Sequence, residues 1–417
     1  MGKRVGIIGA GISGLLSCKY MLQRGYEPIV FEFQSSIGGV WTSPAPPTPP
    51  SPVAPPPSSD PAAFMPQSTP PRPAYQFSDF PWPPKSNEEY PNRSKVHRYI
   101  ESYARHFNLI DCIRFNSKVL SLEYLGATDE EILSWSLWAN TGHAFSSEGA
   151  WKITVQDTEH ETTHVYEVEF VVVCIGKFNS APKMPALPSD KGPEVFKGKV
   201  MHAKEYLMMD ELDAVELIEG KKVVIVGTHK SAFDIATQCA RENGLESPCT
   251  MVITSPNKNS NDAIPNAAGR SNGTIISKLP FALPDDFHKR VEEGSIILEQ
   301  STEWLFCEAG LTLGSEDSQV NADIVIIATG CNGDHRLMSL FKSPAIQKLI
   351  LSSSSGEAPL YRNCIHPRIP QMAIMATSDG VFSINGSETR VKWLVEFFEG
   401  GFRLPTVKEM EDDSGCE

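Results

Sequence analysis

The stretch Val5-Gly6-Ile7-Ile8-Gly9-Ala10-Gly11-Ile12-Ser13-Gly14-Leu15 decides the fold of this 417-residue chain. It opens with a short apolar run that suits a buried parallel strand, and the glycines then break the strand into a turn. Gly9 is expected to make the tight turn, Gly11 to let the backbone approach a pyrophosphate, and Gly14 to let the next helix pack closely. That helix would offer free N–H groups and a positive dipole end to the pyrophosphate.

A carboxylate in a suitable place supports this interpretation. A second strand is expected at Pro28-Ile29-Val30-Phe31, and it ends at Glu32, eighteen residues after Gly14. A carboxylate at this point accepts hydrogen bonds from the hydroxyls of a ribose. A glycine-rich turn in an ordinary α/β unit is the alternative, since the glycine pattern alone is weak evidence. A secretory leader is not expected, because glycines interrupt the apolar stretch.

Composition narrows the function classes. Hydrophobic residues make up 41% of the chain and charged residues 21%, as in ordinary globular proteins, and the length is sufficient for two domains. The formal net charge of −14 disfavours a nucleic-acid-binding surface, because phosphate contacts need clustered Lys and Arg. Nine cysteines without a Cys-x-x-Cys pair indicate reduced thiols and a cytoplasmic location. No apolar run reaches the roughly eighteen residues of a transmembrane segment.

Two unusual segments follow the second strand. Ile37-Gly38-Gly39-Val40-Trp41 has paired glycines that would let the backbone lie against a bound cofactor, with a plain loop as the alternative. Residues 43–74 are so rich in proline that we expect a polyproline-like or disordered insert. A passive linker is the favoured interpretation of this insert, and an SH3- or WW-type ligand is the alternative. Residues 75–83 form an aromatic cluster that is expected to dock on the core.

The middle of the chain repeats the opening pattern. Lys221-Lys222-Val223-Val224-Ile225-Val226-Gly227 is again a strand that ends in a glycine turn, and a helix is expected after it. A duplicated start of this kind is stronger evidence for nucleotide binding than a single one. We expect the first domain at residues 1–210 and 318–417, with the second domain, at 211–317, inserted into it. Two dinucleotide folds in one chain indicate electron transfer between two nucleotides, typically from a nicotinamide to a flavin.

Further elements are expected along the chain. Strands are predicted within residues 113–124, 151–155, 165–170, 170–176, 249–253 and 321–330, and helices at 94–107 and 388–398. Residues 128–149 are expected to form a variable hairpin tip, and 409–417 a frayed acidic tail.

A third motif makes a family resemblance specific. Phe196, Gly198, His202 and Tyr206 match the FxGxxxHxxxY/F fingerprint of flavin-containing monooxygenases. Other parts of the chain resemble the plant branch of that family, namely the first glycine motif, Glu32, the 38–41 segment, the Ala328-Thr329-Gly330 turn and the 77–83 cluster. The resemblance covers most of the chain. It implies an α/β fold of two Rossmann-like dinucleotide-binding domains, with the NADP domain inserted into the FAD domain.

The resemblance also implies a reaction. FAD reduced by NADPH reacts with O2 to give a C4a-hydroperoxide, which transfers one oxygen to a nucleophilic nitrogen or sulfur of a small amine, amino acid or sulfide. This chemistry belongs to the cofactor, so neither a catalytic side chain nor a metal is expected. By position, the FAD-binding residues are Gly9, Gly11, Ser13, Gly14, Glu32, Gly38, Gly39 and Trp41. The NADP(H)-binding residues are Gly227, Lys230, Ser231 and Ala232, and His202 is expected at the domain junction.

The sequence departs from the family in three places. His229 stands where the family has a glycine that lets a phosphate approach, and Lys230 would partly compensate as a point charge. Thr254 stands about where the family has an arginine for the 2′-phosphate. The segment after Ser255 and the C-terminal region are shorter than in the family. Together with the proline-rich insert, this favours a truncated chain, a defective gene model or a decayed paralogue, and a real, short isoform is the equally weighted alternative.

These departures keep other hypotheses open. The second hypothesis is a catalytically impaired FAD-binding remnant of the same family. A pyridine nucleotide–disulfide reductase shares the two-domain layout, but its Cys-x4-Cys pair is missing from the sequence. An interaction module would rest on the proline-rich insert alone.

Overall fold

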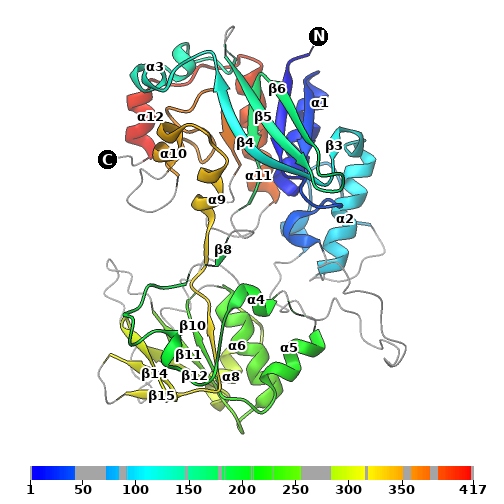
Figure 1. The fold of residues 1–417 in the computed structure, drawn as a ribbon. Coiled ribbons are helices and arrows are strands. Elements are labelled where there is room, and N and C mark those ends of the chain that lie inside the picture. The colour runs from blue at the N-terminus through cyan, green and yellow to red at the C-terminus, as the bar shows by residue number, and fades with distance from the viewer. Residues whose placement is uncertain are drawn as a thin grey trace.

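The computed structural model describes residues 2–42, 72–83, 91, 93–145, 149–176, 181–182, 184–207, 209, 211–228, 230–254, 283–314, 318–350, 358–375 and 384–414. The described chain forms two α/β units, each built on a five-stranded parallel sheet (Figure 1). Between the units, β8 (Ala181–Pro182) pairs antiparallel with β17 (Cys331–Asn332). The fold is therefore a pair of Rossmann-like dinucleotide-binding domains with the second inserted into the first, as predicted.

The first sheet draws its strands from both ends of the sequence. Its order is β18-β7-β1-β2-β3, and all neighbours are parallel. The strands are β1 (Arg4–Ile8), β2 (Glu27–Phe31), β3 (Ile113–Arg114), β7 (Phe170–Val173) and β18 (Met372–Ile374). The central strand β1 is the apolar run that opens the sequence.

Each face of this sheet has its own cover. One face packs against α1 (Ile12–Gln23), α2 (Arg93–His106) and α11 (Ile384–Phe398) through a core that includes Ile7 and Val30. The other face packs, through Ile8 and Phe31, against an antiparallel sheet of β4 (Ser117–Leu125), β5 (Ala150–Asp157) and β6 (Thr163–Val168). Consecutive residues of each strand point to opposite faces, so a strand covered on both sides is apolar throughout.

The second unit repeats this arrangement. Its sheet order is β12-β11-β10-β16-β9, parallel throughout. The strands are β9 (Lys199–His202), β10 (Val223–Val226), β11 (Cys249–Ile253), β12 (Ile296–Gln300) and β16 (Ile324–Ile327). The helices α4 (Ala203–Leu207), α5 (Glu211–Ile218), α6 (Lys230–Asn243) and α8 (Phe287–Glu293) cover one face. The antiparallel strands β13 (Trp304–Cys307), β14 (Gly310–Leu313) and β15 (Gln319–Asn321) cover the other. β10 takes the place of β1, which confirms the predicted repeat.

Strand pairing moves the expected boundaries of the second domain outward. β9 pairs with β16, with Met201 beside Ile326, although both residues fall in ranges that we expected in the first domain. The second unit therefore includes the strands between residues 199 and 327, rather than only 211–317. The sheet to which a short apolar strand belongs depends on long-range pairing, and its local sequence carries no signal for it.

A helix replaces part of the expected hairpin tip at 128–149. The helix α3 (Asp129–Ser134) starts with a capping box, in which the Thr128 hydroxyl accepts from the Glu131 N–H and the Glu131 carboxylate accepts from the Thr128 N–H. The buried Trp138 follows in a 3-10 turn (Trp138–Asn140) and donates through Nε1 to the carbonyl of His366. The segment is thus packed on the core.

The expected frayed tail is also helical as far as Ser414, the last described residue. The helix α12 (Val407–Ser414) buries Met410 and is preceded by Thr406, which exchanges hydrogen bonds with Glu409. Arg368 further holds Glu411 through a two-pronged ion pair. The remaining helical segments are α9 (Gly333–Ser339), α10 (Pro344–Ile350), and 3-10 turns at Gly39–Trp41, Arg72–Tyr75, Ile110–Cys112 and Pro193–Val195.

The aromatic cluster after the proline-rich insert docks on α2. Phe77 stacks on Tyr103 with ring centroids 3.7 Å apart, and Trp82 stacks on Tyr99 at 4.1 Å. Residues 43–71 of the insert lie outside the described residues, whereas its last residues enter the Arg72–Tyr75 turn. The docking prediction is therefore confirmed.

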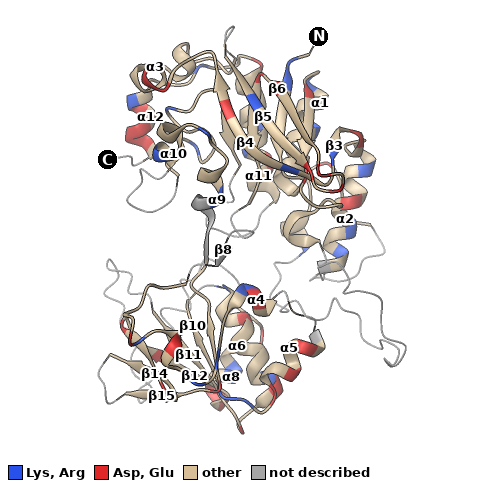
Figure 2. Cartoon of the chain, viewed as in Figure 1, with Lys and Arg blue, Asp and Glu red and all other residues tan. Residues whose placement is uncertain are grey.

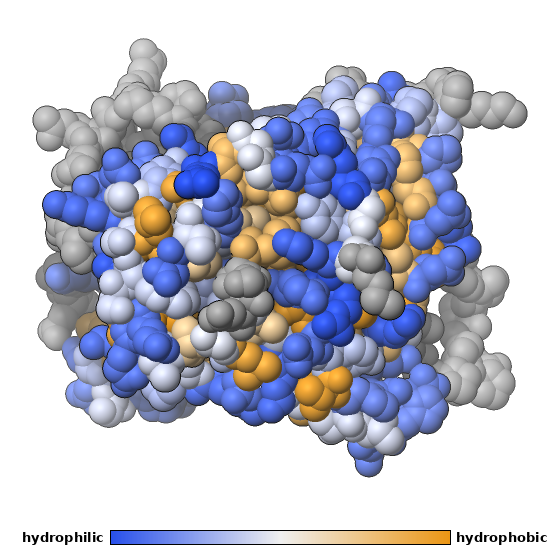
Figure 3. Space-filling model, turned by 90° about the horizontal axis from the view of Figure 1, so that it is seen from above, coloured by the Kyte–Doolittle hydropathy of each residue, from blue (hydrophilic) through white to orange (hydrophobic). Residues whose placement is uncertain are grey.

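Polar side chains predominate on the face of the molecule seen from above. Acidic and basic residues are interspersed along both units (Figure 2), and in the view from above apolar side chains show in scattered patches between hydrophilic ones (Figure 3). Within the described ranges, no helix has both the length and the apolar character needed to cross a bilayer. The seven cysteines whose side chains are described are all free thiols.

Candidate functional site

The first glycine turn is shaped as the sequence predicts. Gly9 follows β1 with φ = +100°, in the left-handed region that favours glycine, and its N–H donates to the carbonyl of Phe31 at 2.8 Å. A Cβ on Gly9 would lie 2.7 Å from the carbonyl oxygen of Cys174. A Cβ on Gly14 would lie 1.9 Å from the carbonyl oxygen of Gly9. Both positions therefore require glycine for reasons internal to the protein.

Gly11 has no such internal reason. Its φ of −74° is open to any residue, and the nearest described atom to a Cβ built on it, chain neighbours aside, is the Gly39 Cα at 3.8 Å. A glycine here leaves the backbone open to close approach from outside the turn. The helix α1 begins at Ile12, so its free N–H groups and the positive end of its dipole lie beside Gly11, with Ser13 in the same turn. The geometry fits a pyrophosphate.

Glu32 lies next to this turn. One of its oxygens, Oε2, accepts from the Ala10 N–H at 2.6 Å, and Oε1 accepts from the Gln34 N–H at 2.9 Å. A carboxylate offers about four acceptor positions, so Glu32 can hold the turn and still accept from ribose hydroxyls. The expected juxtaposition of carboxylate and glycine turn is present.

The Gly38–Gly39 segment closes over the same place. Gly38 has φ = +119° and Gly39 has φ = +59°, and the Gly38 N–H donates to the Ala10 carbonyl at 3.0 Å. A Cβ on Gly39 would lie 3.3 Å from the Gly11 Cα, so a side chain there would crowd the space above Gly11. Trp41 packs into the core, with its ring edge-on to Tyr75 at 5.2 Å, and so anchors the segment.

The second glycine turn repeats the geometry of the first. Gly227 has φ = +150°, and its N–H donates to the carbonyl of Val252 at 3.0 Å, as that of Gly9 does to Phe31. A Cβ on Gly227 would lie 2.4 Å from the carbonyl oxygen of Ala328, which matches Cys174 in the first unit. Ala232 is fully buried in α6 at the position that corresponds to Gly14.

Lys230, whose charge was predicted to compensate for His229, forms an ion pair within the protein. Lys230 begins α6, and its Nζ lies 2.6 Å from Oδ2 of Asp234, one helical turn further on. The Asp234 side chain is only 7% exposed. Ser231 lies half-buried in the same turn. A buried carboxylate therefore shares the positive charge that Lys230 would offer to a phosphate.

The structure describes only some of the positions at which the sequence departs from the family. Thr254 follows β11, is half-buried and carries no charge. His229 and residues 255–282 lie outside the described residues. The described part of this edge thus offers the glycine turn and Lys230 to a nucleotide.

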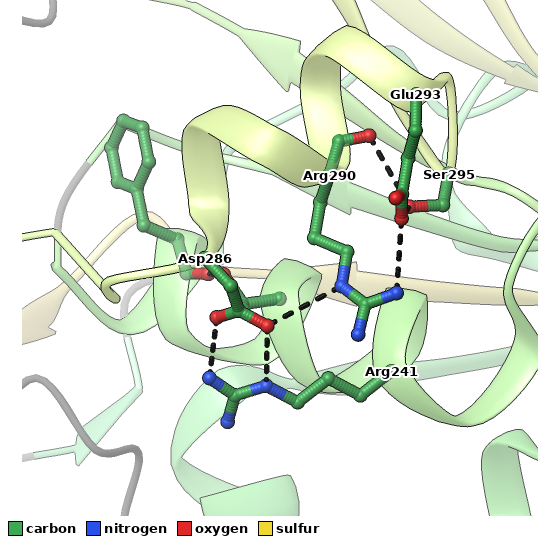
Figure 4. Close-up of polar contacts among 7 residues, drawn as sticks. Arg241, Asp286, Arg290, Glu293 and Ser295 are labelled. Carbon is green, nitrogen blue, oxygen red and sulfur yellow. Dashed lines mark hydrogen bonds and ion pairs between the residues drawn. The ribbon is translucent and has the colours of Figure 1, made fainter.

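Two arginines of the second unit, Arg241 and Arg290, are engaged in a network that ties α8 to α6 (Figure 4). Asp286 accepts from Nε and Nη2 of Arg241 at 2.9 and 2.5 Å, and from Nε of Arg290 at 3.3 Å. Arg290 also donates to Glu293 at 2.9 Å. The hydrogen bonds from Arg241 lower the pKa of Asp286 below its usual range. The network anchors the chain where it returns from residues 255–282.

Three residues of the fingerprint motif are structural. Phe196 lies in the core beneath the β13–β15 sheet, and Tyr206 is fully buried among the helices of the second unit. A Cβ on Gly198 would lie 2.4 Å from the carbonyl oxygen of Asp323. These three motif residues therefore stabilise β9 at the edge of the second sheet.

The fourth residue, His202, lies at the junction. It ends β9, and its Nε2 donates to the carbonyl of Gly330 at 2.9 Å, while its Nδ1 accepts from the Lys204 N–H at 3.1 Å. The ring is thus neutral, and burial lowers the pKa of His202. Gly330 lies directly before β17, where the chain returns to the first unit, so His202 ties the second sheet to the crossing.

Two contacts near the glycine turns were not predicted from the sequence. His97 of α2 lies 2.9 Å through Nε2 from the carbonyl oxygen of Ile37, directly before Gly38. Asp234 pairs with Lys230. The spacing of four residues on an expected helix could have revealed the second contact. The first contact joins segments sixty residues apart and leaves no local signal.

Comparison with known proteins agrees with this geometry. A protein of Arabidopsis thaliana provisionally named flavin-containing monooxygenase 2 is 32% identical, over 98% of this chain and 89% of the relative. The solved S-allyl-L-cysteine S-oxygenase of Allium sativum superposes with a TM-score of 0.68 at 20% identity, over 100% of this chain and 81% of that one. OTEMO, solved in complex with FAD and NADP, superposes with a TM-score of 0.59 at 14% identity, over 98% and 86% of the two chains. The profile of the flavin-binding monooxygenase-like family matches residues 2–246, and the chain belongs to that family.

Proposed function

We propose that the protein is an FAD- and NADPH-dependent monooxygenase that transfers one oxygen atom of O2 to a nucleophilic nitrogen or sulfur of a small molecule. The observation that carries this proposal is the space above Gly11, which is bordered by the α1 N-terminus and Gly39 and has Glu32 beside it. A pyrophosphate and its ribose fit that space. Bound FAD, once reduced, is the group that reacts with O2.

The chain's own residues bind and orient the two nucleotides. In the first unit, Gly11 and Gly39 leave the backbone open to the pyrophosphate, the N–H groups at Ile12 and Ser13 donate to it, and Glu32 accepts from the ribose. In the second unit, Gly227, Lys230, Ser231 and Ala232 receive NADP(H) at the repeated turn. His202 keeps the second sheet in place at the crossing between the units.

Two comparisons support the finer parts of the proposal. OTEMO has the same fold and was solved with FAD and NADP, which supports one nucleotide in each unit. The Allium sativum neighbour is an S-oxygenase, which supports a sulfide or a sulfur-containing amino acid as a substrate class alongside amines.

The test is a spectral titration of the purified protein. The proposal predicts the yellow spectrum of bound flavin, bleaching on addition of NADPH without oxygen, and return of the yellow colour together with formation of a sulfoxide when oxygen and a small sulfide are supplied. Colourless protein that takes up no added FAD would contradict the FAD site. Yellow protein that NADPH never bleaches would contradict turnover.

A second candidate is a catalytically impaired FAD-binding remnant, which the second unit favours. Lys230 shares its charge with Asp234, and Thr254 offers no charge to a 2′-phosphate. Under this alternative the protein binds FAD but reacts equally slowly with NADPH and NADH. Rapid bleaching by either nucleotide would exclude it.

A further inference from the structure

The paired glycines over the cofactor space are held from outside by His97. Two consecutive residues in the left-handed region have no side chains to fix them, and ordering such a segment has a high entropic cost. The contact comes from α2, where His97 lies 2.9 Å through Nε2 from the Ile37 carbonyl oxygen. Because a carbonyl can only accept, Nε2 is the donor.

His97 also limits the position of Gly38. A Cβ built on Gly38 would lie 2.7 Å from Cδ2 of the His97 ring, so the ring packs directly on this glycine. On its other side, Gly38 donates to the Ala10 carbonyl at 3.0 Å, inside the first glycine turn. The segment is therefore fixed between the helix α2 and the turn that follows β1.

The contacts continue into the space that we assign to the pyrophosphate. Gly39 follows Gly38 directly, and a Cβ on Gly39 would lie 3.3 Å from the Gly11 Cα. A shift of the segment toward Gly11 would fill that space, and a shift away would remove one of its walls. The hydrogen bond of His97 thus holds the segment that borders this space.

We propose that His97 is a positioning residue for the flavin nucleotide, which acts by holding the Gly38–Gly39 segment in its binding conformation before the cofactor arrives. The proposal rests on the proposed FAD site. A segment that is ordered in advance spares the ligand the entropic cost of ordering it. Loss of the hydrogen bond therefore weakens FAD binding and leaves the fold of the apoprotein in place.

The test measures FAD affinity of the apoprotein by quenching of flavin fluorescence, alongside its thermal unfolding without FAD. His97→Leu removes the donor, and we expect a loss of affinity of about tenfold, typical of one lost hydrogen bond. His97→Gln retains an N–H donor at similar reach and is expected to restore most of the affinity. Arg98→Gln, at an exposed position on the same helix, is the matched control and should bind like the wild type.

Each outcome bears on the proposal. Unchanged affinity for FAD in His97→Leu overturns the proposal. An equal loss of FAD affinity in the Leu and Gln variants, accompanied by a lower melting temperature of the apoprotein, also overturns it, because His97 would then be merely structural. If the Leu variant does not fold, His97→Asn takes its place, since its shorter amide donor cannot reach the Ile37 carbonyl. A wild-type apoprotein that binds no FAD contradicts the proposed function itself, and the role of His97 with it.

Discussion

At the scale of single residues, the most unusual group is Lys19, a lysine of helix α1 whose side chain is only 1% exposed. It pairs with Asp79 of the docked aromatic cluster, and its Nζ lies 4.4 Å from the ring centroid of Tyr20 and 4.3 Å from that of Phe107. A buried charge persists only where such partners offset its lost hydration. Lys19 therefore fastens the cluster to α1.

Removal of the carboxylate should expose this dependence. We expect Asp79→Asn to lower the free energy of unfolding by about 1–3 kcal/mol, because it leaves Lys19 buried without its counter-ion. The double variant with Lys19→Met should recover most of the loss, since no charge then remains buried. Urea unfolding measures both, with the exposed Asp111→Asn as the control. A double variant as unstable as Asp79→Asn alone would show that the ion pair is not the cause.

A buried histidine should shape the pH dependence of stability. Burial lowers the pKa of His366 from 6.5 to about 4. Between about pH 6.5 and pH 4, the unfolded chain therefore binds a proton at this histidine that the folded chain does not bind. The free energy of unfolding keeps its full value above pH 6.5 and falls as the pH is lowered through this window. The shift corresponds to about 3 kcal/mol. Urea unfolding at a series of pH values should show that the free energy of unfolding falls less steeply in His366→Asn than in the wild type. Equal slopes would refute the assignment of this pH dependence to His366.

At the scale of helices and strands, the sequence predicted regular elements well where their signal is local. The apolar strands β1, β7, β10 and β16 and the helix α1 lie where the patterns place them, because each is buried on a parallel sheet. The helix α11 ends where predicted, at Phe398, but begins earlier, at Ile384. The missed helices α3 and α12 both begin with the same Thr-x-x-Glu signature, at Thr128 and Thr406. That signal was present in the sequence, but the polar surroundings were interpreted as loop and tail.

The proline-rich insert is a prediction at this scale. Trp41 before it and Tyr75 after it are in edge-to-face contact at 5.2 Å, so the chain leaves and re-enters the fold at one place. Replacement of residues 43–71 by a short Gly/Ser linker should leave FAD affinity unchanged, because neither end has to move. Flavin titration of the deletion variant checks this. Loss of flavin binding would show that the insert takes part in the cofactor site.

At the scale of the whole molecule, one architecture is used twice. In both units a glycine with positive φ ends the central strand, donates to the neighbouring strand and faces the carbonyl that follows a third strand, Cys174 in one case and Ala328 in the other. The sequence repeat predicted this duplication and most of the glycine cradle. Contacts between distant segments could not be predicted from the sequence. Examples are the pairing of β9 with the second sheet and the hydrogen bond from His97 to the Ile37 carbonyl.

The central claim, a pyrophosphate lying on Gly11, has one direct test, the FAD titration of a Gly11→Ala apoprotein. The backbone at Gly11 accepts alanine, and the added Cβ would meet described protein atoms only at 3.8 Å, so the variant should fold and melt like the wild type. The account predicts that its affinity for FAD falls about ten- to hundredfold, because the Cβ occupies space that the pyrophosphate needs. Wild-type affinity for FAD in this variant would contradict the account.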